Sequence, residues 1–351
     1  MIVLFDPEPP LVRWCIVNND IITEHVCAFE TDWLNNVQKE IKKYKPLEAI
    51  GYLLYHGGEE IKNPLTLFSS QFLPQIERCI RFLPEYNELI LRIVKECYTI
   101  MPDIHHIILC DTAFFLNLPM EARIYAVPEE LRKRGIRRYG GFGLSHQWAW
   151  EQALLLNESA KRMISIFLGD HTNISAIKDG QVVETSIGFT PVEGVISSNS
   201  CGDIDPTIVF QLVSSGMSLK EINNLLSREG GFTGLLGEFT SLSDILKNSS
   251  DNPGLSLSRD IFIHQVKKYI GAYISVLGGI DILTFMTDKI EETRDLILQI
   301  CRSLEFIGLK CRTNEDQDFK ILSDDGSPIK AYCLKYNKWN VLTEKITNFI
   351  K

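Results

Sequence analysis

Two patterns of hydrophobic and polar positions alternate along the first third of the chain. Short runs rich in β-branched and aromatic residues are typical of strands, and they cover residues 2–5, 11–19, 21–29, 49–58 and 105–110. Two longer stretches carry apolar residues three and four positions apart, which predicts amphipathic helices at 32–44 and 86–98. We therefore expect a mixed α/β domain here.

A second series of strands and helices follows a loop-rich stretch at 114–131, which we interpret as a linker. Strands are predicted at 162–169, 174–187 and 280–286, and the second contains an Asp179-Gly180 pair typical of a hairpin turn. Helical spacing predicts helices at 205–216, 218–229, 258–279 and 294–308. The repeated pattern predicts two domains of the same α/β class.

Composition and charge limit the possible partners. The chain has 351 residues, of which 45% are hydrophobic, so it is long enough to bury two globular cores. Its formal net charge is −9, and its one basic run, at 132–138, is short. Nucleic acids and acidic membranes are bound by clustered Lys and Arg. We therefore expect no nucleic-acid partner and no membrane partner.

The cysteine residues indicate a reducing compartment. There are nine, and no two of them form a C-x-x-C pair of the kind found in zinc and redox sites. The chain starts without a basic leader, and its longest apolar run, 275–286, is interrupted by Asp281. We therefore expect a cytoplasmic protein without a signal peptide, a membrane span or a metal site.

A set of short motifs follows in a fixed order along the chain. They are YHGGE (55–59), CDTAF (110–114), IYAVPEELRKRGIRRYGGFGLSH (124–146), FLG (167–169), ETSIGFTPVEGV (184–195), CGDIDP (201–206), GGFTGLLG (230–237) and KKYIGAYISVLGGID (267–281). Taken together, they resemble the acetate kinase family over nearly the whole chain.

The resemblance implies an α/β fold with two actin-like, or sugar-kinase-like, ββαβαβα domains (the ASKHA class) that face each other across a cleft. It implies an N-terminal domain of residues 1–114 that takes back a C-terminal helix at 340–351. It also implies a C-terminal, dimer-forming domain of residues 115–339.

The family transfers a phosphoryl group between ATP and a short carboxylate, which requires cationic side chains around the transferring group. The positions matched to two family arginines hold Leu53 and Ser200 here. The N-terminal hairpin, which carries Asn, Ser and Lys in the family, reads FDPEPPLVR at 5–13, and its three prolines lack a backbone donor. The resemblance therefore implies that the cations of the substrate site are lost.

The nucleotide side departs from the family as well. The adenosine-contacting Asp and Arg are matched by Ser241 and Ser243, and a glycine-rich turn becomes DKIEE at 288–292, which brings acids to a helix N-terminus. The magnesium-binding Glu is matched by Lys338, whose charge would repel the metal. These changes predict the loss of Mg-ATP binding.

Two catalytic positions of the family are retained. Asp111 matches its catalytic acid, and His146 matches its transition-state histidine. Without the resemblance, Asp111 could equally form a turn or cap after a strand, and His146 could simply begin the next helix.

Two loops match phosphate-binding positions of the family. The first keeps Gly169, but Asp170 and His171 replace Asn and Gly. A carboxylate about 4 Å from a phosphate oxygen costs about 4 kcal/mol at an effective dielectric constant of about 20. The second contains Gly202 and Asp203 within GDIDP, a strand-to-helix turn. We expect the loop shapes to persist without phosphate binding.

Three functions remain open. The losses favour a degenerate acetate kinase homologue, a pseudoenzyme with a binding or regulatory role, no cofactor and a small-molecule ligand that the sequence does not identify. The alternative is an active carboxylate kinase that uses Mg-ATP, with replacement cations from Arg13, Lys289 or Lys338. The third is a different reaction in the inherited cleft, with Asp111 and His146 as acid and base.

The stretch 256–285 is the least altered from the family. The resemblance puts it in the dimer-forming domain, so we expect a homodimer, or a heterodimer with an active paralogue. Core packing is the alternative explanation, because its apolar residues lie at helical spacing: Phe262, Val266, Tyr269, Ile270 and Tyr273.

Overall fold

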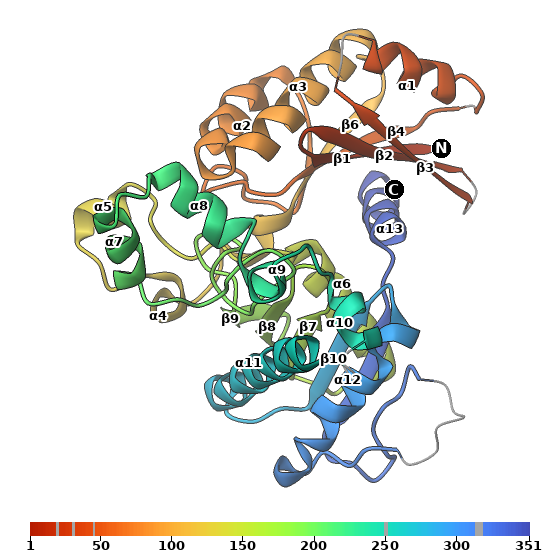
Figure 1. Cartoon of the computed structure of the whole chain (residues 1–351). Helices are drawn as coiled ribbons and strands as arrows, with labels where there is room; N and C mark the ends of the chain where they lie inside the picture. The colour runs from red at the N-terminus through yellow and green to blue at the C-terminus, as the bar shows by residue number, and fades with distance from the viewer. Residues whose placement is uncertain (19–20, 30–31, 45, 249–251, 313–318) are drawn as a thin grey trace. The chain divides into compact units, whose positions relative to one another are not determined.

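The computed structural model describes residues 1–18, 21–29, 32–44, 46–248, 252–312 and 319–351. The chain divides into a first unit, Met1–Leu116 with Asn337–Lys351, and a second unit, Asn117–Tyr336. Each unit has one mixed β-sheet and its own hydrophobic core (Figure 1). The boundary expected after residue 114 falls after 116, and the one expected after 339 falls after 336.

The sheet of the first unit has six strands in the order β3-β2-β1-β4-β6-β5. β1, β2 and β3 form an antiparallel meander, β4 and β6 run parallel to β1, and β5 pairs antiparallel with β6. The strands are β1 Ile2–Glu8, β2 Leu11–Asn18, β3 Ile21–Ala28, β4 Ala49–Leu54, β5 Leu65–Leu67 and β6 His105–Cys110. All five predicted strands are present, but the one predicted at 49–58 ends at Leu54, because the two glycines of the HGG segment at 56–58 favour a turn. Residue 19 lies outside the described residues, and the short β5 was not predicted.

Helices cover this sheet and complete the first unit. They are α1 Trp33–Ile41, α2 Leu73–Cys79, α3 Pro84–Ile100 and α13 Lys338–Ile350, with single 3-10 turns at Ser70–Phe72, Ile80–Phe82 and Asp111–Phe115. α3 packs against β1 and β4. The C-terminal helix α13 contacts β1 and β5, so the end of the chain returns to the N-terminal sheet (Figure 1).

The sheet of the second unit has five strands in the order β11-β10-β7-β8-β9. β7, β10 and β11 are parallel, whereas β8 pairs antiparallel with both β7 and β9. Their bounds are β7 Arg162–Phe167, β8 Asn173–Lys178, β9 Gln181–Thr185, β10 Ile282–Thr287 and β11 Lys330–Lys335. The predicted hairpin turn is confirmed, because Asp179 and Gly180 both have positive φ, 49° and 80°.

The helices of the second unit include several that the sequence pattern did not predict. They are α4 Met120–Arg123, α5 Glu129–Lys133, α6 Gly143–Leu156, α7 Thr207–Ser214, α8 Leu219–Ser227, α9 Gly231–Leu236, α10 Leu242–Asn248, α11 Pro253–Leu277 and α12 Ile290–Arg302, with a 3-10 turn at Glu305–Ile307. The expected linker thus contains two short helices. Nowhere in the described ranges does a helix combine the length and apolar character that a membrane crossing requires.

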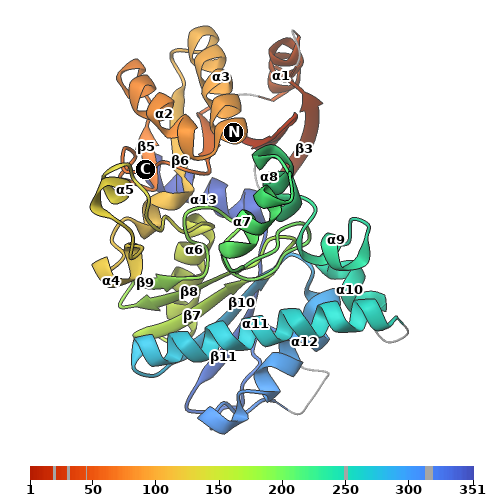
Figure 2. The same ribbon diagram turned by 60° about the vertical axis from the view of Figure 1, so that its left-hand side comes forward.

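The long helix α11 lies along the sheet of the second unit (Figure 2). Four residues of its apolar stripe, Phe262, Val266, Ile270 and Tyr273, are buried in the core of this unit. Core packing therefore explains why these four residues are apolar. They do not form an exposed surface that could favour a dimer.

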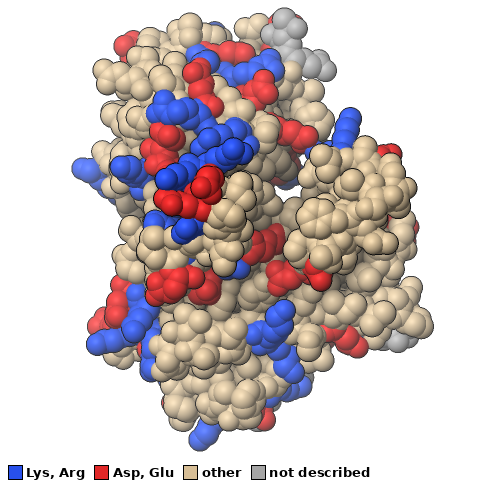
Figure 3. All heavy atoms as spheres, turned by 90° about the vertical axis from the view of Figure 1, so that its left-hand side faces the viewer, with Lys and Arg blue, Asp and Glu red and all other residues tan. Residues whose placement is uncertain are grey.

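Two of the five basic residues in the run at 132–138 form ion pairs with neighbouring acids. Lys133 lies 2.9 Å from Glu129, and Arg138 lies 2.9 Å from Glu184. More widely, acidic and basic side chains are intermixed over the face drawn in Figure 3.

Candidate functional site

An ion pair between a buried carboxylate and a half-buried ammonium joins the first strand of the first unit to its last helix. The Asp6 carboxylate on β1 is fully buried, and its Oδ2 accepts a hydrogen bond from Nζ of Lys338 at 2.5 Å. The Tyr55 hydroxyl donates to Oδ1 at 2.7 Å. Burial, followed by the charge of Asp6, raises the pKa of Tyr55, so this phenol stays protonated as a donor. Both oxygens of Asp6 are therefore engaged within the unit.

The local sequence explains how Lys338 reaches this position. α13 begins at Lys338, and the Asn337 side chain caps it by accepting a hydrogen bond from the Asn340 amide at 2.9 Å. Arg13, another candidate cation, is also engaged, since its Nε lies 3.1 Å from a Glu8 carboxylate oxygen across the β1–β2 hairpin.

Asp111 lies where β6 ends and opens the 3-10 turn Asp111–Phe115, and its side chain is buried. The next residue, Thr112, holds the HGG turn that follows β4, because its Oγ1 accepts a hydrogen bond from the Gly57 amide at 2.9 Å. On the adjacent strand β4, Leu53 is 4% exposed. Asp111 thus has the strand-end position that the sequence indicated.

His146 lies on α6 of the second unit and is fully buried. Its Nδ1 is 2.9 Å from Oγ of Ser165 on β7. Burial lowers the pKa of His146 to about 3, so the imidazole is neutral at physiological pH. Asp111 and His146 belong to different units, and each is built into its own sheet-and-helix framework.

The loop after β7 holds Gly169, Asp170 and His171, and it is tied to the segment 197–200 rather than left open. Oδ1 of Asp170 accepts a hydrogen bond from the Ser198 hydroxyl at 3.0 Å, and its backbone oxygen accepts from the Ser198 amide at 2.9 Å. His171 is half-buried, and burial lowers its pKa. The loop therefore carries an acidic side chain and a neutral ring at its tip.

Gly202 and Asp203 serve the turn that leads to α7. Gly202 has a φ of 70°, and a Cβ there would lie 2.6 Å from the Gly194 oxygen, so the position favours glycine. The Asp203 carboxylate accepts hydrogen bonds from the Gly194 amide at 3.0 Å and from the Tyr269 hydroxyl at 2.6 Å. This turn is thus held by protein groups.

A polar network that the sequence did not single out holds Glu193, the residue before Gly194. The Arg138 guanidinium bridges Glu184 at 2.9 Å and Glu193 at 2.5 Å. The Tyr125 hydroxyl donates to Glu193 and accepts from the Phe189 amide at 2.8 Å. Arg138 stands inside a motif that resembles the family, but only the fold shows which acids it joins.

The positions matched to nucleotide contacts have structural partners as well. Ser241 and Asp244 exchange hydrogen bonds across the first turn of α10, with the Ser241 amide 3.0 Å from Asp244 and the Asp244 amide 3.2 Å from Ser241. At the start of α12, Glu292 lies 2.9 Å from Nζ of Lys247. A helix N-terminus that could receive a phosphate thus already carries an acid.

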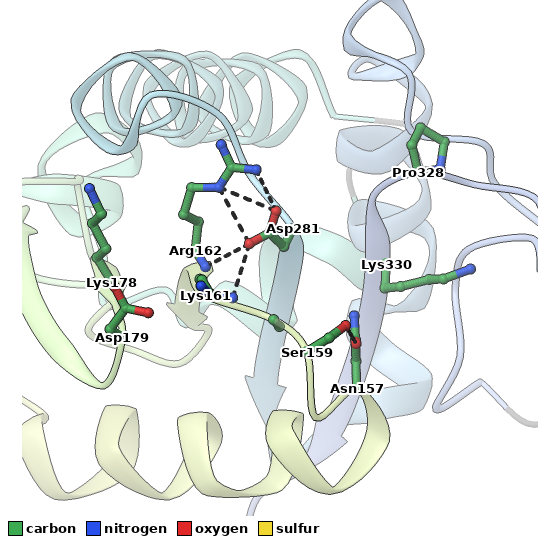
Figure 4. Close-up of a pocket in the computed structure, with 10 residues that line it drawn as sticks. Asn157, Ser159, Lys161, Arg162, Lys178, Asp179, Asp281, Pro328 and Lys330 are labelled. Atoms are coloured by element: carbon green, nitrogen blue, oxygen red, sulfur yellow. Dashed lines mark hydrogen bonds and ion pairs between the residues drawn. The ribbon is translucent and has the colours of Figure 1, made fainter.

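One pocket of the second unit has a volume of about 400 Å³ and lies at the amino ends of β7, β10 and β11 (Figure 4). It surrounds the pair Arg162 and Asp281, whose closest N–O distance is 2.6 Å. Asp281 also accepts from the backbone amides of Lys161 and Arg162 at 3.0 and 2.9 Å. None of the predicted site residues lines this pocket. Within the described residues, no group of three or more His, Cys, Asp or Glu side chains is arranged to hold a metal ion.

Solved structures share this fold over nearly the whole chain. The acetate kinase of Porphyromonas gingivalis superposes with a TM-score of 0.89 at 23% identity, covering 100% of this chain and 99% of the other. A propionate kinase from Francisella tularensis gives a TM-score of 0.87 at 23% identity, covering 98% of each chain. These similarities confirm the expected two-domain, actin-like α/β fold.

Sequence comparison identifies the family. An acetate kinase of Halothermothrix orenii is 32% identical over 328 residues, which is 91% of this chain and 80% of that protein. Acetate kinase 2 of Clostridium perfringens is 31% identical over 319 residues, 88% of this chain and 80% of that protein. The family model described as the Acetokinase family matches residues 19–344. The chain therefore belongs to the Acetokinase family.

Proposed function

We propose that this member of the family has lost phosphoryl transfer and acts as a pseudoenzyme with a binding or regulatory role. The observation that carries the proposal is the ion pair between Lys338 and the buried Asp6. At the position matched to the magnesium-binding Glu of the family, Lys338 binds Asp6 at 2.5 Å. A site for Mg²⁺ needs negatively charged oxygen ligands, whereas here the ammonium of Lys338 neutralises the Asp6 carboxylate.

The substrate side supports the same proposal. Leu53 is aliphatic and buried, and the hydroxyl of Ser200 lies 3.4 Å from the Val192 backbone oxygen. Neither can supply the fixed positive charge that stabilises a transferring phosphoryl group.

The groups that face a nucleotide in the family do not fit Mg-ATP here. Asp170 and the first-turn acids of α12, Glu291 and Glu292, carry negative charge where phosphates would need donors. The expectation of no bound cofactor rests on this charge pattern, and Mg-ATP belongs to the alternative function.

The alternative is an active carboxylate kinase that uses Mg-ATP. It would need replacement cations from Arg13, Lys289 or Lys338. Arg13 pairs with Glu8 and Lys338 pairs with Asp6, whereas Lys289 lies at the N-cap position of α12, beside its first-turn acids. A third possibility, acid-base chemistry by Asp111 and His146, is disfavoured because burial lowers the pKa of His146 to about 3, which makes its imidazole a weak base at neutral pH.

The deciding experiment combines calorimetry with an activity assay. We expect no heat of binding from Mg-ATP at millimolar concentration and no hydroxamate product with acetate, propionate or butyrate. The acetate kinase of Halothermothrix orenii, measured in parallel, is the positive control. A nucleotide at about 100 times its Kd would stabilise the fold by about 2.7 kcal/mol, so a saturable thermal shift is the second readout. Turnover with any of the three acids would favour the active kinase.

The proposal includes a cytoplasmic location and a protein partner, either a second copy of the chain or an active paralogue. Because the stripe of α11 is buried, the support comes from another surface, which we call the α7–α8 surface. Its main apolar residues are Phe210 on α7, which is 68% exposed, and Leu219 on α8, which is 72% exposed. No residue of α7 is buried. Apolar surface of this kind is typical of an interface between protein chains.

A further inference from the structure

The pocket at the amino ends of β7, β10 and β11 carries more positive than negative charge. Its volume of about 400 Å³ suits a small molecule. Four basic side chains line it against two acidic ones, a surplus of two positive charges: Lys161, Arg162, Lys178 and Lys330 against Asp179 and Asp281 (Figure 4). The chain as a whole has a formal net charge of −9, so the pocket is opposite in charge to the rest of the molecule.

Arg162 and Asp281 neutralise each other within the wall of the pocket. Oδ1 of Asp281 accepts a hydrogen bond from Nη2 of Arg162 at 2.6 Å, and Oδ2 accepts from the backbone amides of Lys161 and Arg162 at 3.0 and 2.9 Å. Nη1 of Arg162 donates to the Gly278 backbone oxygen, at the end of α11, at 2.8 Å. This pair therefore has a structural role, and the charge that could attract a ligand comes from the lysines.

Lys161 and Lys178 lie beside this pair. Lys178 on β8 is directly opposite Arg162 on β7, and both side chains extend in the same direction from the sheet (Figure 4), an arrangement of like charges that is destabilising. The Lys161 backbone oxygen accepts a hydrogen bond from the Asp179 amide at 2.8 Å, which keeps the two lysines on adjacent segments. In the described ranges, neither lysine forms an ion pair with a carboxylate, and both are exposed, so an anion can reach them.

Lys330 adds a third ammonium, on β11. It lies on the other side of Asp281 from Lys178 (Figure 4). Its Nζ donates to the Asp325 backbone oxygen at 2.7 Å, so the chain holds this ammonium through a neutral carbonyl group, which leaves its charge in place. Asp179, in the hairpin turn, offsets one of the three lysines. The surplus of two positive charges therefore belongs to the lysines and is spread across the pocket.

We propose that this pocket binds a small molecule that carries two anionic groups, either phosphates or carboxylates. One group lies between Lys161 and Lys178, where it relieves the repulsion between Lys178 and Arg162, and the second balances the charge of Lys330. A nucleic acid is disfavoured, because the overall negative charge of the chain repels it. The pocket lies at the end of β7 opposite to the Gly169 loop, so it is a separate site and goes beyond the proposed function.

The test is calorimetric titration of the full chain with pyrophosphate and with succinate, without metal and at an ionic strength held constant with NaCl. We expect saturable binding of at least one of them, and the comparison shows which acid group the pocket prefers. Combining Lys161→Ala with Lys178→Ala should raise the Kd about tenfold or more, because each lysine supplies a charge-assisted hydrogen bond. The matched control, Lys39→Ala with Lys42→Ala, removes two exposed lysines of the first unit and should bind like the wild type.

Three outcomes would overturn the proposal: no saturable heat from either compound, an unchanged Kd in the pocket double variant, or equal weakening in both double variants, which would show only a general effect of net charge. Circular dichroism checks that the variants fold, and Lys178→Arg, which keeps the charge, should retain binding. The proposed function fails separately. Heat from Mg-ATP that persists in the pocket double variant would contradict the loss of nucleotide binding and would leave this pocket unaffected.

Discussion

At the scale of single residues, the proposed loss of phosphoryl transfer rests on where charged side chains are placed. Lys338 and Asp6 are 332 positions apart in sequence, yet the Lys338 ammonium donates a hydrogen bond to the Asp6 carboxylate at 2.5 Å. The pair also fixes the start of α13 against β1. Lys338 therefore helps to hold the first unit together.

Replacing Lys338 tests this structural role. In Lys338→Met, the fully buried Asp6 keeps only the Tyr55 hydroxyl, so we expect a loss of about 1–3 kcal/mol in the free energy of unfolding. The ammonium is partly exposed, which keeps the loss below that of a wholly buried pair. Urea denaturation measures it. Lys95→Met, which breaks an exposed pair with Glu77, is the control and should change stability by less than about 1 kcal/mol.

Adding Asp6→Asn to Lys338→Met should recover most of that loss, because no buried charge then lacks a partner. A double variant that is less stable than Lys338→Met would argue against the ion pair as the cause.

His146 makes stability depend on pH in a defined direction. Burial depresses its pKa to about 3, while an unfolded histidine titrates near pH 6.5. Below about pH 6.5 the unfolded chain binds a proton that the folded chain does not, so stability is full above this pH and falls toward about pH 3, by up to about 1.4 kcal/mol per pH unit. His146→Gln should flatten this fall between about pH 6.5 and pH 4.5.

Urea unfolding at several pH values measures the slope, and His264→Gln, at an exposed position on α11, is the matched control. His106 and His171, whose pKa values burial also lowers, remain in both variants and cancel in the comparison. Equal slopes in wild type and His146→Gln would contradict a buried neutral imidazole.

At the scale of elements, helices with similar apolar content have opposite environments. α11 buries its stripe in the core of the second unit, whereas α7, with the sequence TIVFQLVS, buries no side chain. α7 and α8 contact each other, but this contact does not cover Ile208, Phe210 and Leu219, which remain exposed. Helical spacing alone does not distinguish these cases, because it shows which residues share a face but not what that face meets.

The α7–α8 surface makes the oligomeric state testable. We expect light scattering at tens of micromolar to give a dimer mass for the wild type, and a monomer mass for Phe210→Ser combined with Leu219→Ser, because burial of large apolar side chains drives association. Phe306→Ser, at an 83% exposed position in the same unit, should leave the mass unchanged.

A wild-type monomer that also ignores an added acetate kinase from the same cell would remove both forms of the partner proposal. A dimer that survives the double substitution would move the interface to another surface.

At the scale of the whole molecule, the proposed loss of function is distributed over both units. Leu53 and Lys338 lie in the first unit, whereas Ser200, Asp170 and the acids of α12 lie in the second. Catalytic groups that act as a unit are not additive, so restoring one of them recovers little.

This reasoning predicts the behaviour of arginine revertants. Leu53→Arg and Ser200→Arg, alone or combined, should give no acetyl phosphate above the rate without protein, because Lys338 and Asp170 still oppose the metal and the phosphates. A hydroxamate assay with acetate and Mg-ATP measures this, and circular dichroism checks that each variant folds. Measurable turnover by either single revertant would show that the arginines were the decisive loss.

Much of the fold follows from the sequence by itself. Alternating and helical spacing predicted the main strands and the longer helices, because side-chain periodicity is set by the local backbone geometry of each element. The Asp179-Gly180 turn followed from the positive φ that its residues tolerate. β11, with the sequence KAYCLK, was missed because a short apolar run between lysines has no periodicity of its own and becomes a strand only beside β10.

Ordered motifs in the sequence determined the family and the positions of Asp111, His146, Gly169 and Gly202. Only the tertiary structure decided what these and their neighbours contact: Lys338 with Asp6, Asp170 with Ser198, and Arg138 with two glutamates. The physical reason is that charge neutralisation, burial and pKa depend on distances between residues far apart in the chain. These distances are set by how sheets and helices pack, and local sequence does not encode them.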